Sequence, residues 1–251
     1  MPWDPDRYLR FRQQRFQPFE DLLALITVRP GLRVVDLGCG TGELTRRLAD
    51  ALPESEVVGI DSSAEMLARA GAVTRPGLRF EPGLIEDIGG TWDLIFSHAA
   101  IQWVDDHSRL VPRLMALLAP GGQVAIQLPA NHEHPSQRLA RDTARSEPFG
   151  IALDGWIRDP QALAVEAYAE LLYAGGGSEI TALAKVYPHV LEDAGAITDW
   201  MRGTALVPYL ERLPDELHDR FLEEYGKRLA ERFPGRPVFF GFKRILFAAS
   251  V

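Results

Sequence analysis

The chain has 251 residues, of which 46% are hydrophobic and 25% charged, as expected for a globular protein with one large α/β domain. Its net charge of -8 argues against nucleic-acid binding, which normally needs a basic surface. A single cysteine excludes an internal disulfide, and no apolar run approaches the roughly 20 residues that span a bilayer. The polar, aromatic start of the chain is unlike a signal peptide, so we expect a soluble, cytoplasmic protein that binds no membrane.

The first 130 residues alternate short apolar runs with amphipathic segments. The runs are typical of buried strands, whereas the segments between them repeat their apolar residues with the period of a helix. Strands are expected within residues 31–38, 55–63, 77–84, 91–100 and 121–129. This alternation with short connections predicts a parallel sheet that helices cover on both faces.

After residue 130 the alternation ends, and longer helical patterns precede a final strand. We predict a single domain, in which the strands near 179–191 and 237–250 complete an α/β core of residues 20–130. A helical cap is expected from the remaining segments, which are residues 1–19, 131–160 and 195–234.

The stretch VVDLGCGTGELT, residues 34–45, places three glycines directly after the first strand. Glycine lets the backbone turn sharply and approach a ligand, and the helix that follows offers free N–H groups to an anion. No lysine follows Gly42, which excludes a phosphate loop. Glu43 stands where the dinucleotide fingerprint has its third glycine, which disfavours an NAD-dependent oxidoreductase.

Two carboxylates narrow the choice of ligand. Asp36 lies two residues before the first glycine, where it would repel a pyrophosphate but attract an ammonium group. Asp61 ends the second strand, at the position that meets a ribose in doubly wound folds. The pattern therefore favours a ligand with an ammonium, a carboxylate and an unphosphorylated ribose. S-adenosylmethionine carries all three groups.

Four segments resemble the successive motifs of class I S-adenosylmethionine-dependent methyltransferases: VVDLGCGTGELT, VVGIDSSAEML, WDLIFSHAAIQWV and LLAPGGQVAIQLP. The flanks, among them WDPDRYLRFRQQRFQPFEDLL and ITDWMRGTALVPYLERL, resemble the trans-aconitate 2-methyltransferase family. The resemblance implies a Rossmann-like class I fold, with a mostly parallel seven-stranded sheet, an antiparallel C-terminal strand and a helical cap. It also implies methylation of a small-molecule acceptor, a carboxylate of a trans-aconitate-like acid.

The resemblance assigns cofactor binding to Asp36, Gly38, Cys39, Gly40, Gly42, Asp61, Ser62, Met66, Ile85 and His98. The alternative for Met66 is a core position of a helix, and Cys39 is expected to be a small filler rather than a nucleophile. Leu84 stands where the superfamily commonly has an acid for the adenine, so backbone from Leu84 or Ile85, or the Glu86 side chain, would serve instead. Glu86 and Asp87 could equally cap a helix or face solvent. For His98, three roles stay open: a contact to the methionyl group, a weak base, or a hydrogen-bonded structural residue.

An anionic acceptor calls for cationic and phenolic ligands, because arginine binds carboxylates bidentately. The candidates are Tyr8, Arg15, Trp103, Trp200, Arg202, Tyr209 and Arg244, of which Tyr8 and Arg244 fall on matching family positions. The chain departs from the family pattern at Val207, where arginine is usual, and at Ala169, where tyrosine is usual. No metal site is expected. A methyltransferase for a phenol, amine or quinone precursor and a cofactor-binding module without turnover remain alternatives.

Overall fold

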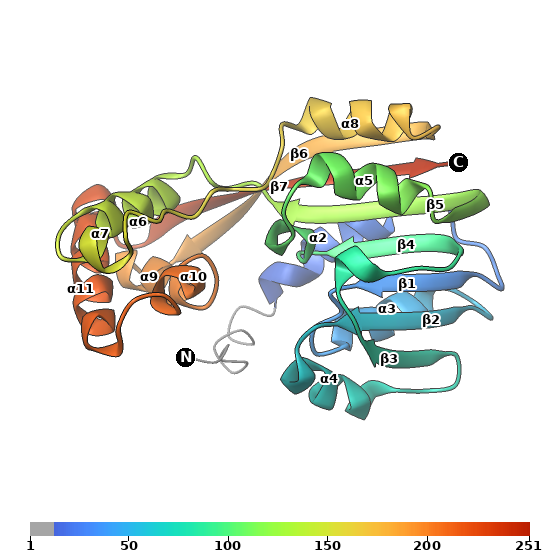
Figure 1. The fold of residues 1–251 in the computed structure, drawn as a ribbon, viewed down its shortest axis with the longest axis horizontal. Helices are drawn as coiled ribbons and strands as arrows, with labels where there is room; N and C mark the ends of the chain where they lie inside the picture. Colours follow the sequence, from blue (N-terminus) through green and yellow to red (C-terminus); the bar gives the residue numbers. More distant parts are fainter. Residues whose placement is uncertain (1–12) are drawn as a thin grey trace. The chain divides into compact units, whose positions relative to one another are not determined.

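The structure is a computed structural model that describes residues 13–251. Within that range the strands form one seven-stranded sheet with the order β3-β2-β1-β4-β5-β7-β6 (Figure 1). The strands are β1 (Arg33–Leu37), β2 (Glu56–Asp61), β3 (Leu78–Pro82), β4 (Trp92–His98), β5 (Leu118–Pro129), β6 (Ser178–Leu191) and β7 (Val238–Ser250). The predicted class I fold, mostly parallel with an antiparallel C-terminal strand, is confirmed.

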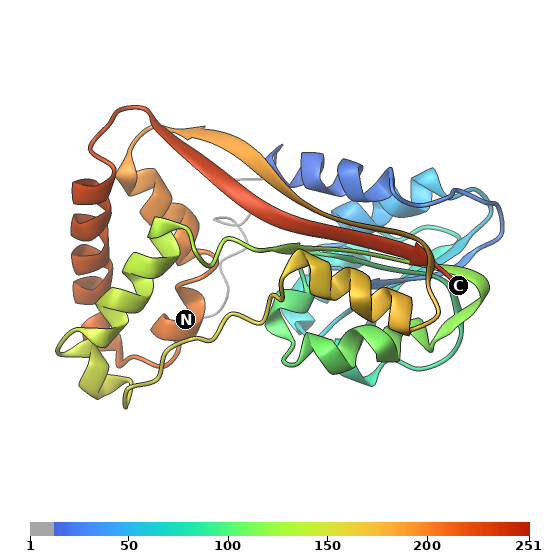
Figure 2. The same cartoon turned by 90° about the horizontal axis from the view of Figure 1, so that it is seen from above.

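Helices or short 3-10 turns separate the first five strands, and further helices precede and follow β6. The helices are α2 (Gln13–Leu23), α3 (Glu43–Ala51), α4 (Ala64–Ala70), α5 (His107–Met115), α6 (Pro135–Arg145), α7 (Phe149–Ala152), α8 (Val165–Ala174), α9 (Ala194–Arg202), α10 (Val207–Leu210) and α11 (Asp215–Arg232). Short 3-10 turns are η1 (Gly71–Val73), η2 (Ile85–Asp87) and η3 (Ile101–Trp103). Figure 2 shows α2 and α3 on one face of the sheet and α5 and α8 on the other. Both faces are therefore covered, as the alternating pattern predicts.

The strand β1 lies between β2 and β4 and is parallel to both, with Val35 opposite Val58 and Ile95. Four of its five residues are buried, as is usual for a parallel strand with helices on both faces. The carboxyl ends of these parallel strands meet at one edge of the sheet, where ligands of such folds bind. Antiparallel β7 pairs with β5 up to the pair of Pro129 and Arg244, so Arg244 reaches the same edge.

The described chain divides into two compact units. The sheet unit comprises residues 17–129, 161–185 and 244–251, and the helical unit contains residues 130–160 and 186–243. In the helical unit, the core includes Phe221 of α11, whose ring meets that of Phe149 edge-on at 5.1 Å. Tyr225 is fully buried there, and its hydroxyl donates to the carbonyl oxygen of Ser136 at 3.1 Å. The helical unit thus has an apolar core of its own. The predicted single domain with a helical cap stays a prediction.

Of the helices in residues 13–251, none combines the length and the apolar character needed to cross a bilayer.

Candidate active site

The glycine loop joins β1 to α3 at the carboxyl edge of the sheet. Gly38, Gly40 and Gly42 all have positive φ angles, of 75°, 55° and 76°. A Cβ on Gly38 would lie 2.2 Å from the Cβ of Ala100, and one on Gly42 would lie 2.6 Å from the ring of Phe80. A Cβ on Gly40 would have no atom within 4 Å. The outer glycines therefore allow close packing, and the middle one leaves backbone open to a ligand.

Asp61, at the end of β2, holds the glycine loop in place. Its Oδ2 accepts from the backbone N–H of Gly40 at 2.9 Å, and its Oδ1 accepts from that of Ser63 at 2.8 Å. Each oxygen keeps a second lone pair, which a ribose hydroxyl can use. Ser63 caps α4, because its hydroxyl accepts from the backbone N–H of Met66 at 3.3 Å. Ser62 is exposed beside it.

Asp36 is a buried carboxylate at the end of β1, with 4% of its surface exposed. The hydroxyl of Thr45 donates to its Oδ2 at 2.6 Å, while its Oδ1 is buried with no hydrogen-bond partner among the described residues. Burial raises the pKa of Asp36 to about 7, against the hydrogen bond from Thr45 and with the help of the charge on Asp61. A buried carboxylate oxygen without a partner, four residues before the open Gly40, suits a cationic group of a ligand.

Three further predicted cofactor residues surround the loop. Met66 is 7% exposed on α4, and Ile85 begins η2 with its Cδ1 3.8 Å from the point that a Cβ on Gly38 would occupy. Burial raises the pKa of the Cys39 thiol, and the charges of Asp36 and Asp61 act in the same direction. The thiol therefore stays protonated at neutral pH, which is unfavourable for a nucleophile. Leu84, the residue before η2, is half exposed.

The end of β4 forms the neighbouring wall of this edge. The ring of His98 meets Phe19 of α2 edge-on at 5.9 Å, so His98 lies on the α2 face of the sheet. Ala99 follows with a positive φ of 55°, and its carbonyl oxygen accepts from Nε2 of Gln102 at 2.7 Å. Trp103, in η3, has 45% of its surface exposed. The three predicted roles of His98 stay open.

Arg244 is the candidate acceptor residue that lies deepest in the sheet unit. It is 5% exposed, and its Nη1 donates to Oε1 of Gln127 at 3.3 Å. Gln127, in β5, is fully buried and was not among the residues predicted from the sequence. The only available signal was a glutamine within the otherwise apolar run VAIQLP. A buried polar residue of this kind is the informative departure from an apolar strand.

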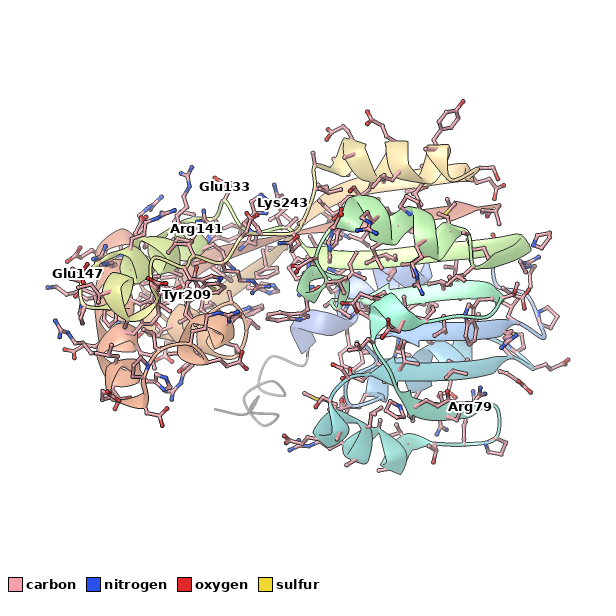
Figure 3. The ribbon with its side chains drawn as sticks, in the orientation of Figure 1. Arg79, Glu133, Arg141, Glu147, Tyr209 and Lys243 are labelled. Carbon is pink, nitrogen blue, oxygen red and sulfur yellow. The ribbon has the colours of Figure 1, made fainter. Side chains whose placement is uncertain are left out.

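The helical unit holds the other described acceptor candidates. Trp200 of α9 is 6% exposed and packs on Phe242, with ring centroids 5.4 Å apart. Tyr209 of α10, labelled in Figure 3, is 2% exposed. Its ring meets that of Trp156 edge-on at 5.4 Å. Burial raises the pKa of Tyr209, although a backbone N–H and nearby arginine charges oppose this. Arg202 ends α9 and is partly exposed.

Two candidates cannot be placed. Tyr8 lies outside the described residues, and the side chain of Arg15 does as well. Among the residues that are described, no group of three or more histidine, cysteine, aspartate or glutamate side chains could hold a metal ion.

Known proteins are similar to this chain in sequence and in fold. Residues 34–122 match the family model for a methyltransferase domain. The chain is 50% identical, over 256 aligned positions, to trans-aconitate 2-methyltransferase of Deinococcus radiodurans, covering 100% of this chain and 98% of that one. It is 41% identical to the protein of the same name from Variovorax paradoxus, with 94% and 92% covered. The crystal structure of YcgJ from Bacillus subtilis matches with a TM-score of 0.62 at 16% identity, covering 94% and 98%, and supports the fold alone.

Proposed function

The chain belongs to the trans-aconitate 2-methyltransferase family, and on that basis we propose that it methylates a carboxylate of trans-aconitate. S-adenosylmethionine is the cofactor, and its sulfonium charge supplies an activated methyl group. The observation that carries the choice of an anionic acceptor is Arg244, a buried cation at the carboxyl edge of the sheet. Arginine is suited to hold a carboxylate because its planar fork donates two parallel N–H bonds.

For each polar group of the cofactor, the sheet edge offers a residue that could bind it. The orphaned Oδ1 of Asp36 would accept from the ammonium group, and the backbone at Gly40 would approach the methionyl part. The free lone pairs of Asp61 would accept from the ribose hydroxyls, while its bonds to the loop keep it in place. Hydrogen bonds to a charged partner contribute roughly 1.5–3 kcal/mol each, so these two aspartates would account for much of the affinity.

No general base is needed for a carboxylate acceptor, because the carboxylate is already ionised and nucleophilic at neutral pH. The residues then have to bind and align the two reactants. Alignment alone can lower the barrier by about 7–11 kcal/mol. The raised pKa of the Cys39 thiol also leaves no competing thiolate beside the methyl donor.

Transfer of label from methyl-labelled S-adenosylmethionine tests the proposal. The protein would be incubated with trans-aconitate, with other di- and tricarboxylates, and with phenol and amine controls. A labelled methyl ester of trans-aconitate is expected, and mass spectrometry would identify it. Label on phenols or amines alone would contradict the proposal. Tight binding of S-adenosylhomocysteine without turnover of any carboxylate would instead favour a cofactor-binding module.

A further inference from the structure

Gln127 has a buried amide donor without an acceptor. The side chain is fully buried in β5, and its Nε2 has no hydrogen-bond partner among the described residues. An unsatisfied buried donor is unfavourable, and most buried polar atoms in folded proteins do have a partner. Gln123, on the same strand, shows the usual situation: its Oε1 accepts from the backbone of Thr27 at 2.7 Å, and its Nε2 donates to the same residue at 3.0 Å.

The orientation of the Gln127 amide follows from its neighbour. Nη1 of Arg244 donates to Oε1 of Gln127 at 3.3 Å. A guanidinium group has only donors, so the amide oxygen must face it and the amide nitrogen must point elsewhere. Turning the amide over would place two donors against each other. The orphaned donor is thus a consequence of Arg244.

The register of the sheet places these groups beside the predicted reaction centre. His98 is opposite Gln127, and Pro129 is opposite Arg244. Because strand residues alternate between faces, His98, Gln127 and Arg244 share the α2 face at the carboxyl edge. Gln127 and Arg244 lie two and three strands from β1, or about 10 and 14 Å at the usual strand spacing.

We propose that Gln127 and Arg244 together bind a second, non-reacting carboxylate of the acceptor. Nε2 of Gln127 and the guanidinium group would donate to the two oxygens of that carboxylate. An oxygen that accepts such bonds has its lone pairs engaged and is a poor nucleophile, so the methyl group goes to a different carboxylate. The acceptor class is therefore an acid with at least two carboxylates. The inference rests on the proposed function, and it makes Gln127 a determinant of specificity.

Gln127→Glu is the sharpest test. The variant keeps an oxygen for Arg244 but replaces the amide donor with a second, negatively charged oxygen. Its melting temperature should be equal to or above that of the parent, because Arg244 gains an ion pair. The KM for trans-aconitate should rise roughly 10- to 100-fold, as expected for a lost hydrogen bond to a charged group. The Kd for S-adenosylhomocysteine, measured by calorimetry, should stay within about twofold.

Gln123→Glu is the matched control, because it makes the same change on the same strand at an amide that Thr27 satisfies. It should lower the melting temperature and leave the KM for trans-aconitate within about twofold. With a monocarboxylate analogue of trans-aconitate as substrate, the rate of the parent protein should not reach saturation. An unchanged KM in stable Gln127→Glu, or equal use of the monocarboxylate, overturns the inference while the proposed function stands. No turnover of any carboxylate by the parent protein overturns the proposed function itself.

Discussion

The buried carboxylate of Asp36 should make stability and cofactor affinity depend on pH in opposite directions. The test is Asp36→Asn, which is nearly isosteric and keeps an oxygen to accept from Thr45. It removes the charge that burial makes unfavourable. It also removes the charge that would attract the ammonium group of the cofactor. The variant should therefore be more stable and bind less tightly.

The size of the stability effect follows from the two pKa values of the carboxyl group. The pKa of Asp36 rises from 3.8 to about 7 on folding, so the folded chain binds more protons between these values. Stability associated with Asp36 is then fully present below pH 3.8 and is lost as pH rises through 7. At about 1.36 kcal/mol per pH unit, the loss is about 4 kcal/mol at pH 8 and less than half of that at pH 5. Asp36→Asn should recover this free energy.

Urea denaturation of the cofactor-free protein at pH 5 and pH 8 measures the effect. The free energy of unfolding of Asp36→Asn should exceed that of the parent more at pH 8 than at pH 5. A variant that is equally stable or less stable at pH 8 would refute the reasoning about a buried charge. Thr45→Val is the control, since without its hydrogen bond the pKa of Asp36 should rise further.

Calorimetry with S-adenosylhomocysteine measures the second effect. Binding of its ammonium group requires ionised Asp36, so the affinity of the parent should fall by up to about tenfold for each pH unit below 7. Protons should be released on binding at pH 6, which titrations in two buffers of different ionisation enthalpy detect. Asp36→Asn should bind more weakly at pH 8 and show little dependence on pH. Parent-like affinity of the variant at pH 8 would exclude Asp36 as the ammonium partner.

Four other substitutions test the glycine loop and the core of the helical unit. Asp61→Ala should weaken S-adenosylhomocysteine roughly 100-fold or more in calorimetry, because it removes the loop and ribose bonds together; unchanged affinity would exclude the assignment. A positive φ strains both Gly38→Ala and Gly40→Ala, but only the Cβ at position 38 would overlap Ala100, so Gly38→Ala should destabilise the protein more; equal melting temperatures would contradict this. Gly40→Ala should also reduce cofactor affinity. Trp200→Ala should lower the free energy of unfolding by about 3–5 kcal/mol in urea denaturation, and a smaller loss would mean that the ring contributes little to the core.

The sheet was predictable because its determinants are local. A buried parallel strand such as β1 has an uninterrupted apolar run, and the glycines after it mark the turn into α3. The place of Asp61 was also predictable, because parallel strands end at a common edge. Its two bonds to backbone N–H groups were not, since they depend on the conformation of the loop.

The acceptor side was harder to predict, because burial of a polar or aromatic residue is a tertiary property. From the sequence alone, Trp200 and Tyr209 could be core residues of helices or ligands of the acceptor. The structure places both in the core of the helical unit. Gln127 gave almost no signal, since one glutamine in a strand is ordinarily exposed. Only the donor-to-acceptor contact with Arg244 distinguishes it.

The two departures from the family pattern bear differently on anion recognition. Ala169 lies on α8, and the adjacent Tyr168 stacks on Phe247 at 4.5 Å, so α8 covers the face opposite to α2. A tyrosine at 169 would belong to a helix on the other face from Gln127. Val207 opens α10 in the helical unit and is partly exposed.

If Gln127 and Arg244 hold the second carboxylate, binding of that group does not require an arginine at position 207. Val207→Arg should therefore change the KM for trans-aconitate by no more than about twofold. This change in KM should be smaller than the increase in KM caused by Gln127→Glu. Val207→Lys should behave in the same way as Val207→Arg. Parallel KM measurements on these variants decide the matter. A larger change from Val207→Arg than from Gln127→Glu would place the main anion contact in the helical unit rather than at the strand ends of β5 and β7.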